Sequence, residues 1–139
     1  MVDRDLLLNK SGIIERCIKR VEEEYNANPE NLKIITKQDS IILNIQRAGE
    51  ASIALGMHIV AEEGLGIPQY SREAFELLAK HDFIDEVLAG QLMAMVGFRN
   101  IAIHEYQKID LAILRSIIEN NLADLKTFTR QVLKLLKSP

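Results

Sequence analysis

The sequence contains no tryptophan and a single cysteine, Cys17, and aromatic residues account for only 5% of its length. The interior of the folded protein must therefore be filled mainly by Leu, Ile, Val and Ala. A single cysteine excludes an internal disulfide and fits a reducing compartment. Because Cys17 lies on the apolar side of a helical pattern, we expect it to be a packing thiol rather than a reactive one.

Long apolar runs are also absent, and none approaches the roughly 18 residues that a membrane-spanning helix requires. The first residues, Met1 to Asp5, lack the basic stretch and the apolar block of a signal peptide. We therefore expect a cytoplasmic protein with no membrane partner. With 139 residues, of which 47% are hydrophobic and 27% charged, the chain suits one globular domain that spans residues 1–139.

Positive charge is not in excess either. Seventeen basic side chains stand against twenty acidic ones, which gives a net charge of −3. Proteins that bind nucleic acids mainly by neutralising phosphates are usually basic overall. We therefore expect no DNA partner, and any contact with RNA must come from a local basic patch.

The sequence does contain clear helical periodicity. Apolar residues recur every three, four or seven positions in four long segments and one short one, which is the period of a one-sided helix. No β-pattern, internal repeat or low-complexity segment competes with this periodicity. The predicted fold class is therefore all-α, an antiparallel helical bundle of four long helices plus one short helix. The predicted ranges are 3–25, 37–63, 71–80 for the short helix, 83–103 and 110–135.

Polar residues and helix breakers mark the ends of these helices. The first helix should stop before Pro29, because a proline disfavours the helical conformation in the residue that precedes it. Glycines mark the segment 64–68 as a loop. Side chains that accept hydrogen bonds from free backbone N–H groups should cap the helix starts. The expected caps are Asp3 or Asp5, Ser71 and Asp110.

Reactive side chains are densest near the end of the helix predicted over residues 83–103. Arg99, Asn100, His104 and Tyr106 follow one another within eight residues. On a regular helix, Arg99 and His104 would lie about 140° apart around the axis and about 7.5 Å apart along it. Either the helix ends or loosens near His104, or the two residues serve partners on different sides. A site shared between two protomers would satisfy the second alternative.

These residue types suit the cleavage of RNA without a metal ion. The guanidinium of Arg99 matches a phosphate or a phosphorane, and it stays charged throughout a reaction. The imidazole of His104 can take a proton from a ribose 2′-hydroxyl or give one to the leaving 5′-oxygen. Asn100 could orient the phosphate or the imidazole. A capping and surface arrangement is the alternative, because the helix dipole favours a protonated histidine near a helix C-terminus.

Other polar residues allow simpler interpretations. Arg47 and Glu50 are spaced to form a local ion pair, although Arg47 could instead contact a phosphate. His58 is expected to be a half-buried packing histidine rather than a metal ligand, because no Cys, Asp or second His follows at metal-binding spacing. His81 is interpreted as a turn residue. We therefore expect no metal site in this chain.

The motif Arg99-Asn100-x3-His104-x-Tyr106 resembles the Arg-x4-His-x-Tyr motif of the HepT-type toxins of the HepT/MntA system. These toxins are minimal members of the HEPN superfamily of helical ribonucleases. The resemblance extends to the segments that surround the motif, and it covers most of the chain. The similar segments are Asn44–Ala51, Ile67–Phe75 and Gly97–Asn100.

This resemblance implies a homodimer in which paired motifs line a cleft at the interface. Arg99 and His104 would be the catalytic residues, and Asn100 would occupy a variable polar position. The protein would be the toxin of a type VII-like toxin–antitoxin pair. Its partner would be a minimal nucleotidyltransferase that transfers AMP from ATP onto Tyr106, whereas cleavage itself would need no cofactor.

Two classes of function therefore remain open from the sequence. The first is a metal-independent endoribonuclease toxin that cuts an RNA substrate. The second is a non-catalytic helical subunit that binds the substrate of a two-component nucleotidyltransferase. A dimeric packing module without a site is a third and simpler possibility.

Overall fold

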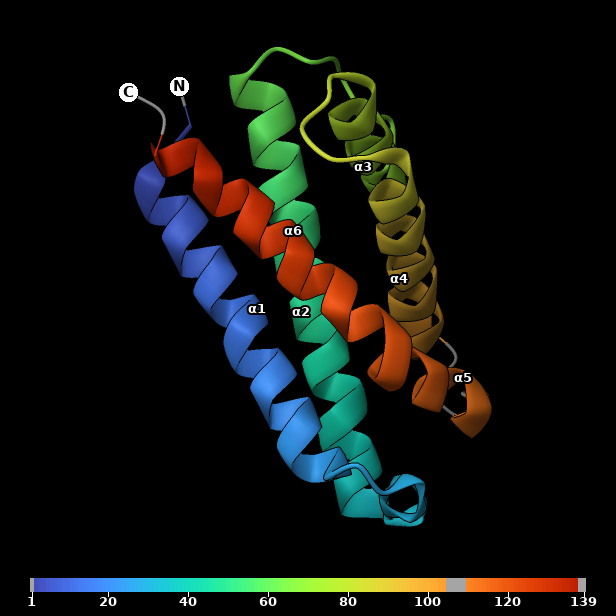
Figure 1. Ribbon diagram of the computed structural model, residues 1–139. Helices are drawn as coiled ribbons and strands as arrows, with labels where there is room; N and C mark the ends of the chain where they lie inside the picture. Colours follow the sequence, from blue (N-terminus) through green and yellow to red (C-terminus); the bar gives the residue numbers. More distant parts are fainter. Residues whose placement is uncertain (1, 105–109, 138–139) are drawn as a thin grey trace.

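The computed structural model describes residues 2–104 and 110–137, and almost all of this chain is helical (Figure 1). The predicted short helix is α3 (Ser71–Lys80), and a 3₁₀ turn, η1 (Pro29–Lys33), follows the first helix. The last predicted helix is a continuous helical run that contains a π-helical turn, η3 (Ile117–Asn121). In chain order, the elements are α1 (Arg4–Tyr25), η1 (Pro29–Lys33), α2 (Ile35–Glu62), α3 (Ser71–Lys80), α4 (Glu86–His104), α5 (Leu111–Ser116), η3 (Ile117–Asn121), α6 (Leu122–Lys134) and η4 (Leu135–Lys137).

Aspartate side chains cap most of the helix starts. Asp3 accepts a hydrogen bond from the Leu6 backbone N–H at 3.2 Å, as predicted. Asp110 likewise caps the last helical run through the Ala112 N–H at 2.8 Å. These bonds satisfy N–H groups that have no partner within the helix.

The predicted cap of α3 is wrong. Ser71 is the first helical residue, and Tyr70 occupies the cap position without a side-chain hydrogen bond. The carboxylate of Glu73 instead reaches back and accepts a hydrogen bond from the Gln69 N–H at 3.1 Å. A glutamate in the first turn can satisfy a free donor in this way without a capping serine.

Two other helix starts differ from the predicted positions. The helix predicted from Phe83 begins at Glu86, because Asp85 caps it by accepting a hydrogen bond from the Leu88 N–H at 2.7 Å. The helix predicted from Lys37 begins earlier, at Ile35, immediately after η1. Asn28 starts η1 by accepting a hydrogen bond from the Glu30 N–H at 3.1 Å. Local polar contacts therefore decide these boundaries more than the apolar period does.

The helices pack as an antiparallel bundle in which α2 is covered on several sides. Figure 1 shows α1 and α6 on one side of α2, and α3 and α4 on another. The start of α1 and the end of α6 lie at the same end of the bundle. Within the described residues, no helix is both long enough and apolar enough to span a membrane.

The core brings together aliphatic side chains from every long helix and one aromatic pair. The rings of Phe75 and Phe128 meet edge to face, with their centroids 5.7 Å apart. Gly56 of α2 lies beside Phe75, and a Cβ atom there would lie 3.4 Å from the Phe75 ring, in ordinary van der Waals contact. The side chains of both phenylalanines are fully buried.

A polar contact connects the end of α1 to the π-helical turn. The Tyr25 hydroxyl donates a hydrogen bond to the carboxylate of Glu119, which also accepts one from Arg115 at 3.1 Å. Burial, and then this hydrogen bond, raise the pKa of Tyr25, and the same bond lowers the pKa of Glu119. The contact therefore favours a neutral phenol and an ionised carboxylate at neutral pH.

The aromatic pair provides a test of the core. We expect Phe128→Ala to lower the free energy of unfolding by about 3–5 kcal/mol, because it leaves a cavity opposite Phe75. Ile67→Ala is the control, since Ile67 is 86% exposed, and it should change stability by about 0.5 kcal/mol at most. Urea-induced unfolding measures both variants. Similar losses for the two would contradict this description of the core.

Candidate functional site

Helix α4 carries three of the four residues of the predicted site. Its buried side packs against α2, α3 and α6, which fixes the direction of the helix. Arg99, Asn100 and His104 all belong to the last turns of α4. Tyr106 lies outside the described residues. The side chains that form this buried side are Leu88, Ala89, Leu92, Met95, Val96 and Phe98.

The helical backbone of α4 continues as far as His104. The positions of Arg99 and His104 therefore lie about 140° apart around the helix axis, with about 7.5 Å of rise between them. The described part of α4 also ends at His104, so both predicted alternatives stay open. One copy of the helix presents the two positions in different directions.

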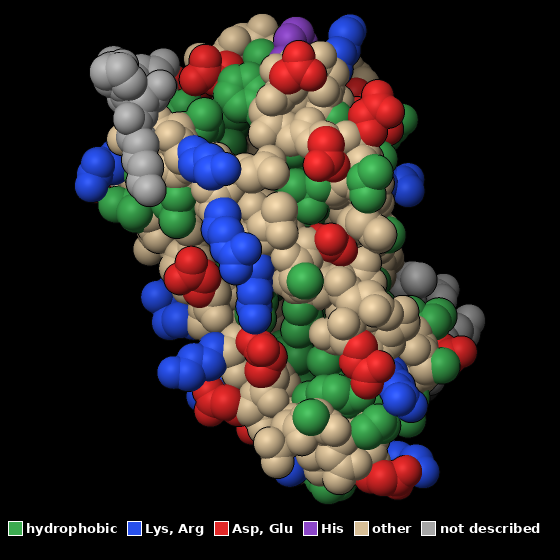
Figure 2. Space-filling model, in the orientation of Figure 1, with side chains coloured by type: hydrophobic (Ala, Val, Ile, Leu, Met, Phe, Trp, Pro, Cys, Tyr) green, Lys and Arg blue, Asp and Glu red, His purple; other side chains and the backbone are tan. Residues whose placement is uncertain are grey.

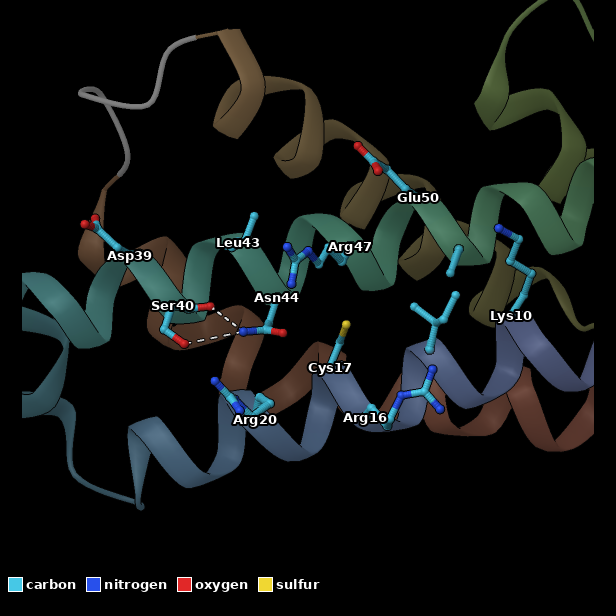
Figure 3. Close-up of a pocket in the computed structure, with 12 residues that line it drawn as sticks. Lys10, Arg16, Cys17, Arg20, Asp39, Ser40, Leu43, Asn44, Arg47 and Glu50 are labelled. Atoms are coloured by element: carbon cyan, nitrogen blue, oxygen red, sulfur yellow. Dashed lines mark hydrogen bonds between the residues drawn. The ribbon is translucent and has the colours of Figure 1, made fainter.

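A second polar feature lies between α1 and α2, and we call it the α1/α2 groove. It is a cavity of about 740 Å³ that is open to solvent. Four basic side chains line it, together with two acidic ones and a buried amide. Figure 3 shows the basic side chains of α1 on one side and Arg47 of α2 on the other. The charged lining residues are Lys10, Arg16, Arg20, Asp39, Arg47 and Glu50.

The floor of the α1/α2 groove is polar and ordered by hydrogen bonds. Asn44 is only 7% exposed, and its amide donates to the Ser40 backbone oxygen at 2.8 Å (Figure 3). The amide also lies 3.4 Å from the Ser40 hydroxyl. A buried amide that already has a partner adds a fixed dipole to the groove without a large desolvation cost.

Cys17 lies in the wall of the same groove and is only 6% exposed. Burial raises the pKa of this thiol above its ordinary value of 9.0, although the nearby guanidiniums of Arg47 and Arg16 lower it in part. A raised pKa keeps the sulfur protonated and unreactive at neutral pH. The prediction that Cys17 is a packing thiol agrees with this position.

The two other polar residues considered from the sequence have simple surroundings. His58 is half-buried, and its Nε2 accepts a hydrogen bond from the Asp3 backbone N–H at 2.9 Å. The local ion pair of Arg47 with Glu50 stays a prediction. In Figure 3 the guanidinium of Arg47 lies toward α1, whereas Glu50 points away from α1. Arg47 is thus available to the α1/α2 groove.

Sequence reasoning missed the contribution of α1 to this groove. Arg16 and Arg20 are four residues apart on one side of α1, and Lys10 lies seven residues before Cys17. The spacing of the two arginines was a usable signal for a basic stripe. It could not show that the stripe faces Arg47, because that depends on how two helices are rotated against each other.

Comparison with known proteins identifies the family. The family model described as Ribonuclease HepT-like matches residues 14–132. The chain is 43% identical over 124 residues to the mRNA nuclease HepT of Shewanella oneidensis, and the match covers 89% of this chain and 93% of that protein. The chain therefore belongs to the HepT-like ribonuclease family, which confirms the predicted resemblance.

Solved structures of related toxins have the same fold. A toxin–antitoxin complex with AMP-PNP matches with a TM-score of 0.89 and 41% identity, over 95% of this chain and 99% of that chain. The tri-AMPylated Shewanella oneidensis HEPN toxin in complex with MNT antitoxin matches with a TM-score of 0.88 and 42% identity, over 96% of this chain and 99% of that one. The predicted all-α, HEPN-like bundle is confirmed.

The raised pKa of Cys17 leads to a test in solution. We expect the native thiol to react with iodoacetamide at pH 7 at least about tenfold more slowly than the same thiol in urea, because burial keeps it protonated and shielded. Mass spectrometry of quenched samples measures both rates. Equal rates would show that Cys17 is accessible and would contradict the buried position.

Proposed function

We propose that this chain is the toxin of a type VII-like toxin–antitoxin pair and that it acts as a metal-independent endoribonuclease. The observation that carries the proposal is the pair Arg99 and His104 in the last turns of α4, in a chain that belongs to the HepT-like ribonuclease family. The related protein of Shewanella oneidensis is described as an mRNA nuclease, which supports RNA as the substrate.

The proposed reaction is an internal transesterification of RNA. The ribose 2′-oxygen attacks the neighbouring phosphorus, and the bond from that phosphorus to the 5′-oxygen breaks. Arg99 stabilises the negative charge that builds up on the phosphoryl oxygens. His104 acts as general acid or base on the 2′-hydroxyl or the leaving 5′-oxygen, and Asn100 orients the phosphate. These groups supply charge and proton transfer without a metal ion or other cofactor.

We infer that the active site is shared between two copies of the chain. Arg99 and His104 are attached to different sides of a regular α4, so one copy presents them in different directions. A twofold axis would bring a second α4 beside the first and place both residue types around one cleft. The homodimer is therefore part of the proposed mechanism.

The proposed regulator is a minimal nucleotidyltransferase antitoxin that transfers AMP from ATP onto Tyr106. Support comes from relatives of similar fold: one solved toxin is tri-AMPylated in complex with MNT antitoxin, and another toxin–antitoxin structure contains AMP-PNP. An adenylate two residues from His104 would bring negative charge to the phosphate site and repel RNA. Because RNA and ATP are both cytoplasmic, we propose that the protein acts in the cytoplasm.

Substitution of the proposed acid or base tests the function. We expect His104→Ala to reduce RNA cleavage by the purified protein by at least about 100-fold, because proton transfer by a positioned side chain contributes on this scale. His81→Ala is the control, since His81 is an exposed residue in the turn after α3. Gel analysis of a labelled RNA measures the rates, with EDTA present to test metal independence.

Each outcome of this experiment has a clear meaning. Loss of cleavage with His104→Ala and retention with His81→Ala would support the assignment. An unchanged rate with His104→Ala would show that the activity lies elsewhere or belongs to a contaminant. If the unsubstituted protein does not cleave RNA, the non-catalytic binding subunit becomes the better hypothesis.

Substitution of the proposed acceptor tests the regulation. We expect Tyr106→Phe to remove the mass increments of adenylation when the chain is produced with its nucleotidyltransferase partner, because the acceptor hydroxyl is absent. Tyr70→Phe is the matched control, since Tyr70 is 62% exposed and lies outside the motif. Intact-mass measurement compares the two variants. Adenylation that persists in Tyr106→Phe would refute this acceptor.

A further inference from the structure

We propose that the α1/α2 groove binds the sugar–phosphate backbone of a single RNA strand. This inference rests on the proposed function, because it takes RNA as the ligand, but it concerns residues outside the motif on α4. The groove lies between α1 and α2, and its basic side chains belong to neither α4 nor the segment that follows it. It would hold part of the substrate outside the site of cleavage.

The charge of the groove is the first argument. Its lining contains four basic side chains against two acidic ones, in a chain whose net charge is −3. Figure 3 shows Asp39 and Glu50 pointing away from α1, so the cations surround the centre of the groove. An excess of cations gathered in a concave site attracts anions.

Several cations on two facing helices make a chain of phosphates a better ligand than a single carboxylate. Three of the four cations are arginines, namely Arg16, Arg20 and Arg47, and the guanidinium fork matches phosphate oxygens. They come from two facing helices, so an anion between them would be held from both sides. Asn44 adds a buried amide dipole at the floor.

The length and width of the groove favour a polymer in single-stranded form. Lys10 and Arg20 are ten residues apart on α1, which corresponds to about 15 Å along the helix. A nucleic acid strand carries one charge per about 3.4 Å of rise in a duplex, so several phosphates fit this length. A cavity of about 740 Å³ is too small to enclose a whole duplex.

The lining also indicates what the groove does not recognise. None of the described residues that line it is aromatic, so it offers no platform on which bases could stack. Contacts to phosphate carry no direct sequence information. The groove should therefore strengthen RNA binding to a similar extent for all sequences, and base selection would fall to other parts of the protein.

A different basic row on α6 is a weaker candidate. Figure 2 shows basic side chains in a row near the seam between α1 and α6, with acidic side chains among them. Lys126 in this region forms an ion pair with Glu22 at 3.3 Å. The hollow beside it is lined by as many acidic as basic residues: Glu15 and Glu22 against Lys126 and Arg130. Paired charges of this kind attract a polyanion less.

The test measures RNA binding separately from cleavage. The full-length chain carrying His104→Ala serves as the parent, so that the RNA stays intact. Into it we would introduce Arg20→Gln together with Arg47→Gln, both at exposed positions whose substitution should leave the fold intact. Fluorescence anisotropy with a labelled single-stranded RNA of mixed sequence gives the Kd at several salt concentrations. Thermal unfolding checks that the variant is folded.

We expect the groove variant to bind at least about tenfold more weakly and to depend less on salt. The slope of log Kd against log salt should fall by about 1.4, because each phosphate contact on a single strand contributes about 0.7. A second RNA of unrelated sequence should show the same loss. Arg72→Gln with Arg130→Gln is the matched control, since it removes the same charge at exposed positions of α3 and α6.

Several outcomes would overturn the inference. These are unchanged affinity and slope in the groove variant, an equal loss in the control variant, or a loss for one RNA sequence only. Loss of antitoxin binding with intact RNA binding would assign the groove to a protein partner instead.

Cleavage by the unsubstituted chain is assayed in parallel. If the unsubstituted chain cleaves RNA but the groove substitutions do not change RNA binding, only the proposed role of the groove is refuted. If the His104→Ala parent binds no RNA, both proposals are refuted.

Discussion

Burial of α2 on several sides is the constraint on which the rest of the structure depends. One surface of this helix packs along α1, another receives α3 and α4, and α6 lies across it. Small residues such as Ala48, Ser52 and Gly56 keep the neighbouring helices close, which dispersion and hydrophobic burial both favour. The direction of α4, and therefore the placement of Arg99 and His104, follows from this packing.

Much of this arrangement could be predicted from the sequence because it follows from periodicity. The apolar stripe that contains Leu125, Phe128 and Val132 indicates both a helix and the side that is buried, since both follow from a repeat of 3.6 residues. The buried residues of α2 include neighbours such as Ile41, Ile42 and Ile45, and a stripe this wide is typical of a helix covered on more than one side. Family resemblance then assigned a function to the motif, which periodicity alone could not do. The single domain over residues 1–139 stays a prediction.

Features that depend on one local contact or on two distant segments could not be predicted. Asp85 caps α4, whose start was predicted near Phe83, and Glu73 binds the Gln69 N–H ahead of α3, where Ser71 was the predicted cap. The contact of Tyr25 with Glu119 joins residues far apart in the chain, and no spacing rule indicates it. The α1/α2 groove also depends on contacts between separate segments of the chain. The basic residues of α1 and the single Arg47 of α2 are separate in the sequence, and the packing of the two helices makes them one surface.

The π-helical turn η3 has a consequence for any attempt to redesign the C-terminal part of the chain. Ile117 and Ile118 are adjacent, yet both are buried, because the wider turn inserts one residue into the helical count. Leu114 and Phe128 are fourteen residues apart, which on an ideal α-helix would place them within about 40° of each other around the axis, so the sequence shows one unbroken stripe. A designer who replaced the wider turn by an ideal α-helical one would therefore see no change in the apolar pattern and would still alter the rotation of α5 relative to α6.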